Sequence, residues 1–431
     1  MTMEQPNPRA RAVQILDQVL TKHQLLEEIL TGSLNGLPGR DRALARAMAS
    51  TCLRHLGIID HLIDKMVDRP LPVKATRVRH IIRLGITQIL FLNIPSHAAV
   101  HDTVELIPDN SKYKGLVNAL LRRTDRQGRN LLEKMNQPYR NTPLWLWNSW
   151  KDFYGEEVAT LIGNAHLNEA ALDISVKGDA ENWAEKLSAT ILPTGSLRRL
   201  AGGSIIDFPG FEDGEWWIQD AAAALPAQLF NDIEGKRVLD LCAAPGGKTA
   251  QLATKGALVT ALDRSKARLK KLEENMERLG LSVTVTVADA TEFVPDEPFD
   301  AILLDAPCSS TGTIRRHPDV AILKSDGDVK KLADLQSRLL DATIAQLKSG
   351  GTLVYSTCSL QSEEGEWQIK DFLEKYPEMK RVPIKSEEVG GLSHILNEDG
   401  EIRCLPHHSV GIEDDKPGGM DGFFACRLMK H

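Results

Sequence analysis

Apolar residues in the first third of the chain recur every three or four positions. The stretches 11–20, 40–66, 77–92 and 114–129 all show this spacing, which is typical of amphipathic helices. Prolines fall between these stretches, where helices are expected to end. The pattern predicts that residues 8–135 are helical almost throughout.

From about residue 216 the pattern changes to short aliphatic runs that alternate with helical stretches. The runs are β-branched, end in polar residues, and lie at 236–243, 257–263, 282–289, 299–307, 351–359 and 422–430. The clearest helical stretches between them are 266–280 and 329–348. This alternation predicts an α/β domain over residues 216–431, with a mainly parallel sheet covered by helices on both faces.

The segment between these two regions has a mixed pattern. Residues 142–165 have a helical spacing, whereas residues 171–178 and 203–210 resemble short strands. We interpret residues 143–215 as a small mixed α/β linker subdomain, which leaves residues 1–142 as a separate all-helical domain.

The composition narrows the class of protein. The chain has 431 residues, of which 42% are hydrophobic and 26% charged, as expected for two or three globular domains. No apolar run reaches the roughly 18 to 20 residues of a membrane span, and the N-terminus lacks the pattern of a secretory signal. The six cysteines include no pair at C-x-x-C spacing, so we expect a cytoplasmic protein with reduced thiols and no metal site.

Charge is distributed unevenly along the chain. Residues 1–142 contain 21 Lys and Arg against 13 Asp and Glu, although the whole chain has a net charge of −7. A basic helical domain on an acidic protein favours a polyanionic partner such as RNA. A merely solvated helical surface would explain the same asymmetry.

Polar residues follow the predicted strands at their carboxyl ends. Ligands of open parallel sheets bind beyond these ends. The side chains expected to meet at this edge are Asp240, Asp263, Asp289, Asp305, Cys308 and Cys358.

The loop after the first strand, CAAPGGKT at 242–249, is typical of a nucleotide-binding turn. Its glycines let the backbone approach a ligand, and the following helix offers free N–H groups. A P-loop NTPase is an alternative, but Cys242 stands where the first P-loop glycine belongs. Asp263 ends the next strand and is placed to accept hydrogen bonds from ribose, and Asp289 could accept one from an adenine amino group. We therefore expect S-adenosylmethionine (SAM) as the cofactor.

Four motifs together resemble the RNA cytosine-5 methyltransferase family, in particular its bacterial small-subunit rRNA branch. They are DLCAAPGGKT (240–249), DAPCSSTGTIRRHPD (305–319), YSTCSL (355–360) and DGFFACRL (421–428). The helical front, with IPSHAAVHDTVELI (94–107) and KGLVNALLRR (114–123), resembles a NusB-like RNA-binding domain. The resemblance implies an all-α NusB-like domain followed by a Rossmann-like SAM-dependent methyltransferase domain with a mainly parallel seven-stranded sheet.

The resemblance also implies roles for individual residues. The nucleophile would be Cys358, with Cys308 acting in product release and Asp305 contacting cytosine N3. The cofactor would be held by Cys242, Ala243, Ala244, Pro245, Gly246, Gly247, Lys248, Asp263, Asp289 and Asp305.

Cytosine chemistry explains why two thiols are needed. Addition of a thiolate at C6 makes C5 nucleophilic toward a methyl donor, which is covalent catalysis. The C5 proton must leave afterwards so that the thiol can be eliminated. Spacing alone does not say which of Cys308 and Cys358 adds, because DNA enzymes use the cysteine of a Pro-Cys motif. Lys248 could lower a nearby thiol pKa or simply support the loop.

Two basic segments are candidates for RNA contacts. Arg315, Arg316 and His317 follow the first cysteine and could contact phosphates beside a base held outside a stack, although a solvated loop is the alternative. Arg122 and Arg123 lie at the end of an amphipathic stretch and suit phosphate contacts.

The resemblance implies SAM-dependent C5 methylation of a specific cytosine in 16S rRNA, and we expect a monomeric enzyme with no membrane or obligate protein partner. The RNA could be free 16S rRNA or an early small-subunit assembly intermediate. The same reaction on tRNA, and an RNA-binding adaptor with an inactive methyltransferase domain, are alternatives.

Overall fold

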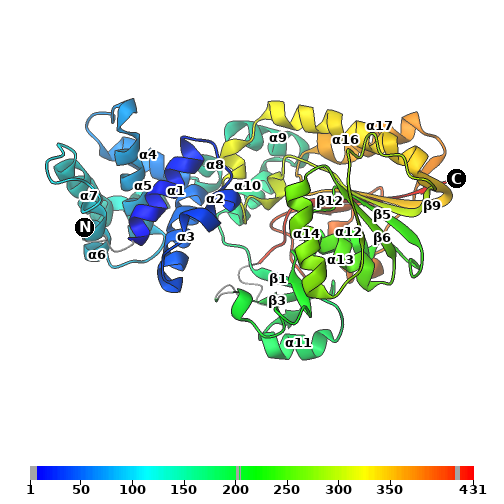
Figure 1. Ribbon diagram of the computed structural model, residues 1–431. Coiled ribbons are helices and arrows are strands. Elements are labelled where there is room, and N and C mark those ends of the chain that lie inside the picture. Colours follow the sequence, from blue (N-terminus) through cyan, green and yellow to red (C-terminus); the bar gives the residue numbers. More distant parts are fainter. Residues whose placement is uncertain (1–6, 200–202, 204, 413–417) are drawn as a thin grey trace. The chain divides into compact units, whose positions relative to one another are not determined.

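The computed structural model describes residues 7–199, 203, 205–412 and 418–431 (Figure 1). The described chain forms two compact units, and each is presented by itself. Unit 1 comprises Met1–Leu167 and Ile314–Lys324, and unit 2 comprises Asn168–Thr313 and Ser325–His431.

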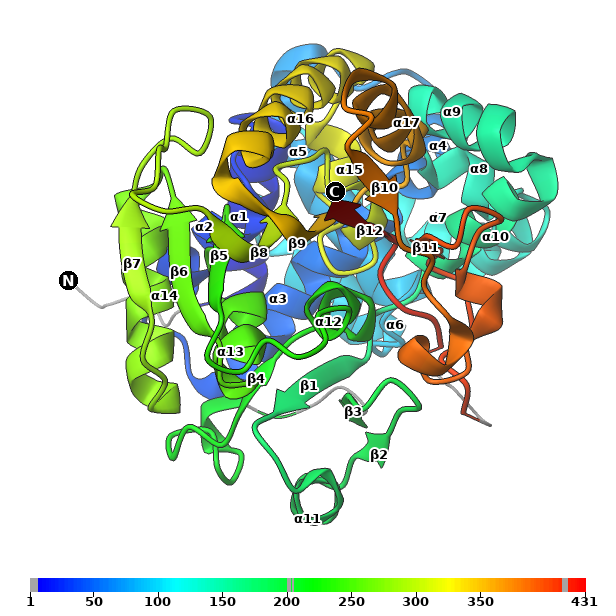
Figure 2. The ribbon, with the colours of Figure 1, turned by 90° about the vertical axis from the view of Figure 1, so that its right-hand side faces the viewer.

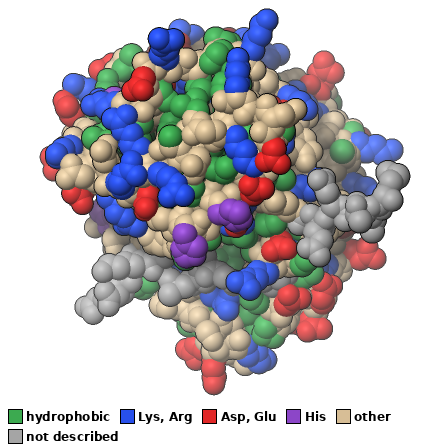
Figure 3. Space-filling model, turned by 90° about the vertical axis from the view of Figure 1, so that its left-hand side faces the viewer, with side chains coloured by type: hydrophobic (Ala, Val, Ile, Leu, Met, Phe, Trp, Pro, Cys, Tyr) green, Lys and Arg blue, Asp and Glu red, His purple; other side chains and the backbone are tan. Residues whose placement is uncertain are grey.

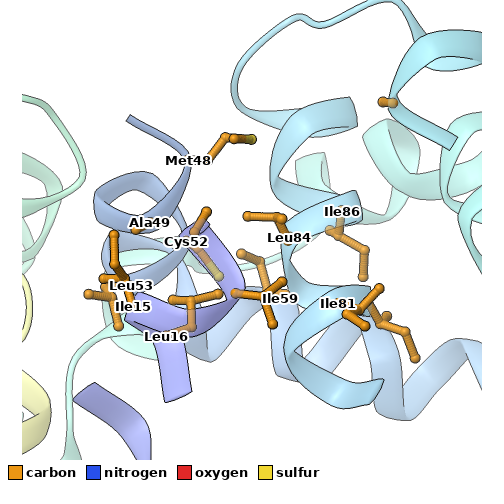
Figure 4. Close-up of a cluster of buried hydrophobic side chains, with 14 of the residues drawn as sticks. Ile15, Leu16, Met48, Ala49, Cys52, Leu53, Ile59, Ile81, Leu84 and Ile86 are labelled. Atoms are coloured by element: carbon orange, nitrogen blue, oxygen red, sulfur yellow. The ribbon is translucent and has the colours of Figure 1, made fainter. Parts of the chain in front are cut away.

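Unit 1 is helical, as the apolar spacing predicts. Its helices are α1 (Pro8–Leu20), α2 (Leu26–Ser33), α3 (Gly39–Arg54), α4 (Leu56–Met66), α5 (Thr76–Leu90), α6 (Ser96–Val104), α7 (Lys114–Glu133), α8 (Gln137–Asn141), α9 (Leu144–Tyr154), α10 (Glu156–His166) and α15 (Val320–Leu323), with a 3₁₀ turn η1 (Val73–Ala75). Their apolar faces meet in one core (Figure 4), where side chains such as Leu16, Met48, Ile59 and Leu84 are fully buried. Burial of this kind contributes roughly 25 cal/mol per Å² of apolar surface.

The long helical stretch 40–66 is interrupted in the structure. His55 ends α3 with ψ near 19°, and its ring stacks on Phe91 at a centroid distance of 4.0 Å. Gly57 follows at a point where α8 approaches closely. A Cβ there would lie 1.9 Å from the Arg140 carbonyl oxygen, so only glycine fits the position.

The boundary between the two compact units differs from the domain boundary predicted from the hydrophobic pattern. Helices α9 and α10 pack with unit 1, so compactness places a boundary after Leu167 rather than after residue 142. The segment Ile314–Lys324, which follows the first cysteine motif, also packs within unit 1. There Asp319 Oδ2 accepts the Leu26 N–H at 2.9 Å, and the Arg315 carbonyl accepts Arg54 Nη2 at 2.7 Å.

Unit 2 contains an eight-stranded sheet, shown in Figure 2. Seven strands run in the order β10-β12-β9-β8-β5-β6-β7, and β11 pairs beside β12. The strands are β5 (Arg237–Leu241), β6 (Leu258–Asp263), β7 (Thr284–Val287), β8 (Phe299–Asp305), β9 (Leu347–Thr357), β10 (Met379–Arg381), β11 (Ile402–Cys404) and β12 (Phe423–Lys430). β5 to β9 are parallel and the others antiparallel. The predicted mainly parallel sheet is confirmed, with the short β11 added to the expected seven strands.

Helices cover both faces of this sheet (Figure 2). One face packs against α12 (Ala221–Gln228), α13 (Gly247–Thr254) and α14 (Lys266–Leu279), and the other against α16 (Asp326–Gln346) and α17 (Glu366–Lys375). Because successive strand residues point to opposite faces, Val238 belongs to the first core and Leu239 to the second.

A smaller antiparallel sheet precedes the main one in unit 2. Its order is β2-β3-β1-β4, from β1 (Leu172–Val176), β2 (Thr190–Ile191), β3 (Leu197–Arg199) and β4 (Trp216–Ile218), with α11 (Ala180–Leu187) packed on it. The strand expected at 203–210 is wrong. The structure has a 3₁₀ turn, η2 (Ile205–Asp207), closed by the Phe208 N–H on the Ile205 carbonyl, and the Pro209-Gly210 pair that follows suits a turn.

Candidate active site

The carboxyl ends of the parallel strands bring the predicted residues to one edge of the sheet. β5 leads into Cys242, β6 ends at Asp263, β7 precedes Asp289, and β8 ends at Asp305. β9, the neighbour of β8, ends at Thr357, one residue before Cys358. Parallel register therefore explains how residues far apart in sequence converge.

The loop 242–249 wraps the beginning of α13. Cys242 has φ of +62°, and Gly246, the N-cap of α13, has φ of +104°. A Cβ on Gly246 would lie 2.9 Å from Leu272 Cγ of α14, so this path needs glycine for both conformation and space. Burial raises the pKa of the Cys242 thiol to about 12, which keeps that cysteine protonated and unsuited to nucleophilic attack.

Asp240, in β5, is hydrogen-bonded to the end of the loop at Thr249. It is 1% exposed, and its Oδ2 accepts a hydrogen bond of 2.6 Å from the Thr249 hydroxyl. Its Oδ1 is buried without a hydrogen-bond partner among the described residues. Burial raises the pKa of this carboxyl to about 7. The environment therefore favours the uncharged form of Asp240, and its hydrogen bond to Thr249 gives it a structural role.

Asp263 presents a buried acceptor at the end of β6. Its Oδ1 accepts the Ser265 N–H at 2.9 Å, whereas its Oδ2 has no hydrogen-bond partner among the described residues. Arg268 Nη1 lies 3.2 Å from Oδ2, an ion pair without hydrogen-bond geometry. Arg268 also donates to the Ala244 carbonyl. Sequence reasoning missed Arg268, whose only signal is its place one turn into the helix after Asp263.

Asp289 differs from Asp263 in exposure. It lies on the surface, and its Oδ1 accepts both the Thr291 hydroxyl at 2.7 Å and the Thr291 N–H at 2.9 Å. These two hydrogen bonds lower the pKa of its carboxyl. The side chain is therefore an exposed carboxylate already engaged by its own turn.

Lys248 and Asp305 form an ion pair beside the thiols. Lys248 Nζ lies 2.7 Å from Asp305 Oδ2, and the Ser356 hydroxyl donates to Asp305 Oδ1 at 3.0 Å. Lys248 Nζ is also 5.0 Å from the centroid of the Phe423 ring. Such fixed contacts orient the carboxylate, which is one third exposed.

The two cysteines lie in contact. The sulfur atoms of Cys308 and Cys358 are 3.4 Å apart, and both side chains are partly accessible. At this distance one thiol donates a hydrogen bond to the other, and no disulfide exists between them.

The surroundings of the two thiols favour opposite protonation states. The pKa of Cys358 is lowered, first by the hydrogen bond from Cys308 and further by the Ser310 hydroxyl and the Lys248 charge, against burial and Asp305. The pKa of Cys308 is raised, first by its bond to Cys358, then by burial and by the charges of Cys358 and Glu364. Cys358 is thus the thiol whose anion the site stabilises. Glu364 carried no signal in the sequence, because it lies in a polar loop after the second motif.

A cavity of about 520 Å³ adjoins the loop within unit 2. It is bounded by residues 243–248, by Trp217 and Gln219, and by Met276 of α14, and its walls include both Lys248 and Asp305. Its size is that of a small-molecule or nucleotide pocket. The cavity therefore reaches the ion pair beside the thiols.

The candidate RNA-binding residues lie in unit 1 and differ in accessibility. Arg122 on α7 is exposed, whereas Arg123 is partly buried and donates to the Met66 carbonyl at 3.0 Å. Arg315 is only 2% exposed, and Arg316 and His317 are partly buried. In this conformation the Arg315 side chain is not accessible to a phosphate group from solvent. Figure 3 shows a face where Lys and Arg side chains predominate over acidic ones in the upper half.

Among the described residues, no group of three or more His, Cys, Asp or Glu side chains could hold a metal ion. None of the helices in this described part of the chain is long and apolar enough to cross a membrane.

Family profiles and individual relatives match both parts of the chain. The profile of the 16S rRNA methyltransferase RsmB/F family matches residues 227–429, and that of the NusB family matches residues 6–126. Ribosomal RNA small subunit methyltransferase B of Shigella boydii serotype 4 is 34% identical over 446 residues, covering 99% of both chains. The chain belongs to the RsmB/F methyltransferase family.

Two more proteins support this membership. Ribosomal RNA small subunit methyltransferase B of Escherichia coli strain SE11 is also 34% identical over 446 residues and 99% of both chains. A crystal structure of a methyltransferase homologue from Pyrococcus horikoshii is 27% identical with a TM-score of 0.55, covering 66% of this chain and 94% of that one. The expected rRNA methyltransferase with a NusB-like front is confirmed.

Proposed function

We propose that this protein methylates C5 of a single cytosine in 16S rRNA, with SAM as methyl donor and a covalent bond between Cys358 and cytosine C6. The observation that carries the proposal is the pair of thiols in contact at 3.4 Å, with opposite pKa shifts, beside the Lys248–Asp305 ion pair. A C5 methylation needs one thiol to add and a second group to act at release.

Each step of the proposed reaction is assigned to one of these residues. The Cys358 thiolate forms a bond to C6, and the electrons of the C5–C6 double bond move through the ring toward N3. As charge develops at N3, a proton passes to N3 from the Lys248–Asp305 pair, and Ser356 orients the carboxylate. After methyl transfer the C5 proton passes to water, the electrons of the C5–H bond re-form the C5–C6 double bond, and Cys358 leaves C6 as a thiolate. Cys308, in contact with that sulfur, donates its S–H hydrogen bond to the departing thiolate.

The strand ends fit SAM. The Asp263 Oδ2 atom is a buried acceptor lacking a hydrogen bond among the described residues, which suits a ribose hydroxyl. The backbone from Cys242 to Gly247 and the α13 N-terminus would lie against the cofactor, with Asp289 at the adenine end. When bound, SAM supplies the methyl group that the activated C5 takes. Arg268 fixes the Asp263 side of the loop through its contact with Ala244.

Bisulfite sequencing tests the proposal directly. The purified full-length chain, incubated with SAM and unmodified 16S rRNA, is expected to protect one cytosine from deamination. The Cys358→Ala variant is the matched control, and it should protect none. Methylation of tRNA in place of 16S rRNA would contradict the substrate assignment, and no methylation of any RNA would favour the inactive-adaptor alternative. Repeating the reaction on an early small-subunit assembly intermediate distinguishes it from free rRNA as the substrate.

A further inference from the structure

A buried carboxylate lies beneath the two cysteine loops and has no part in the steps above. Glu364 belongs to the 3₁₀ turn η4 (Ser362–Glu364) and is 0% exposed. None of the ion pairs found among the described residues includes it. A buried acid without a cation is expensive unless hydrogen bonds stabilise it, so its contacts need an explanation.

The contacts of Glu364 lead to the residues flanking Cys308. Its Oε1 accepts the Ser309 N–H at 2.9 Å and Gln336 Nε2 at 3.1 Å, and its Oε2 accepts the Ser309 hydroxyl. Gln336 Nε2 also donates to the Pro307 carbonyl at 2.8 Å. Burial raises the pKa of the Glu364 carboxyl, and the hydrogen bonds that it accepts from Ser309, Ser359 and Gln336 oppose that shift by stabilising the ionised form.

The same cluster joins the loop of Cys308 to the loop of Cys358. The hydroxyl oxygens of Ser309 and Ser359 are 3.1 Å apart, and the Thr311 hydroxyl accepts the Leu360 N–H at 3.0 Å. The Cys358 carbonyl accepts the Gly312 N–H at 3.0 Å. Glu364 therefore holds the segment that carries Cys308 in register with the segment that carries Cys358.

The charge of Glu364 acts unequally on the two sulfur atoms. It counts among the groups that raise the pKa of Cys308, whereas the cation that favours thiolate on Cys358 is Lys248. The other ionisable groups near Glu364 have partners of their own. Tyr355 donates its hydroxyl to the Glu364 backbone carbonyl, and Arg403 pairs with Glu366. Asp305 is held by Lys248.

We propose that Glu364 is a positioning residue that keeps Cys308 protonated and oriented as the hydrogen-bond donor to Cys358. The inference deepens the proposed function and rests on it for the reaction that the thiols perform. The consequence is that only the Cys358 thiolate is available for addition to cytosine C6, because Cys308 stays protonated while Glu364 is charged. Glu364 touches neither substrate nor cofactor in this role and acts through Ser309.

Thiol alkylation by iodoacetamide tests the proposal without RNA or SAM. In the Cys358→Ala chain, the alkylation rate of Cys308 is followed against pH, with peptide mass spectrometry to identify the modified cysteine. We expect a midpoint above the ordinary thiol value of about 8.5. Adding Glu364→Gln should lower that midpoint by about one pH unit, since removing a nearby negative charge favours the thiolate.

The matched control is Glu363→Gln, which removes the same charge one residue away, where the side chain contacts Ser362 instead of Ser309. It should leave the midpoint unchanged. A purely structural role for Glu364 would change the alkylation rate equally at all pH values without moving the midpoint, and that result would overturn the proposal. If Glu364→Gln does not fold, the alkylation midpoint of Cys308 in the Cys358→Ala chain still tests the proposal. A midpoint at or below that of an ordinary thiol would contradict it, because a nearby negative charge must raise the midpoint.

In the chain with both cysteines, Glu364→Gln should shift neutral-pH alkylation from Cys358 toward Cys308, changing their ratio about tenfold for a one-unit shift. An unchanged ratio would contradict the inference. Because alkylation needs neither RNA nor SAM, a failure here leaves the methylation assay unaffected, and a failure of methylation leaves this measurement unaffected.

Discussion

Cys308 and Cys358 follow neighbouring parallel strands, β8 and β9, and their sulfur atoms touch, yet their environments differ. On the Cys358 side lie the Ser310 hydroxyl and the Lys248 ammonium, and on the Cys308 side lies the Glu364 carboxylate. Equal position in the fold thus does not give equal chemistry. The strands supply proximity, and side chains from other segments decide which sulfur ionises.

The comparison separates two properties of a site that are often treated as one. Proximity follows from backbone register and needs no particular charge. Reactivity follows from a few partners whose contributions to a thiol pKa are each on the order of one unit. Changing those partners one at a time should therefore alter roles while leaving the geometry of the two thiols in place.

The largest expected effect comes from removing the thiols themselves. Cys358→Ala should lose methyl transfer by about 10⁴-fold or more, as expected for a lost nucleophile, and should form no covalent RNA adduct. Cys308→Ala should still add through Cys358 and transfer methyl, but then stall before elimination. Denaturing electrophoresis with radiolabelled RNA and SAM detects the stalled adduct. An adduct from Cys358→Ala with none from Cys308→Ala would reverse the comparison.

The next effect concerns the carboxylate that we propose to contact cytosine N3. Asp305→Asn removes that group, and we expect methyl transfer in single-turnover assays to fall about 10²- to 10³-fold, the usual contribution of a proton-transfer group. Asp300→Asn is the matched control at the other end of β8, where Asp300 pairs with Lys348. Equal losses in both variants would indicate damage to the strand and not to the chemistry.

Much of this site follows from sequence, for reasons visible in particular residues. Asp263, Asp305, Cys308 and Cys358 all follow strands whose aliphatic runs are unmistakable, and parallel pairing must bring their ends together. The helical front likewise follows from its apolar spacing, because its core is built from one face of each helix.

The remaining features depend on contacts between segments that no local pattern records. Glu364 reaches Ser309 across 55 residues, and the burial of Arg315, a candidate for a phosphate contact, has no signal in the sequence around it. Next to the break at His55, Gly57 accommodates the close approach of α8, a contact that the local sequence does not record. Local spacing predicts elements and strand ends, whereas the partners that set reactivity become visible only in the fold.

A third variant acts on the same edge of the sheet but away from the thiols. Asp263→Ala removes the buried acceptor and should weaken SAM binding by about 1 to 3 kcal/mol, the range for a charged hydrogen-bonding group. Isothermal calorimetry measures this loss, and Asp289→Ala, on the exposed turn, should cost less. The alkylation midpoint of Cys358 should stay unchanged in Asp263→Ala. Unchanged SAM affinity in a folded variant would contradict the cofactor assignment.

A fourth variant tests the cation on the Cys358 side. Lys248→Met removes a charge that lowers the pKa of Cys358, so that pKa should rise. The thiolate fraction then falls at neutral pH and recovers at alkaline pH, which predicts a rate lower by several-fold near pH 7 and a profile displaced to higher pH. Lys270→Met, on the exposed face of α14, should leave the profile unchanged. A uniform loss at all pH values would assign Lys248 to supporting the loop.

The smallest effect is expected in the helical unit, whose residues take no part in the proposed methyl transfer. Arg122 is exposed on α7, with its Nε 3.2 Å from Asn118 Oδ1 of the preceding turn. If it contacts one phosphate, Arg122→Ala should reduce the log–log slope of RNA affinity against salt by about one, because one fewer counterion is released. Gln127→Ala on the same helix carries no charge and should not change the slope. Filter binding across a salt series measures both variants, and the alkylation ratio of Cys358 to Cys308 should be unchanged in each. An unaltered slope in Arg122→Ala would make that arginine a solvated side chain, whereas an altered thiol ratio would mean that the helical unit also influences which sulfur ionises.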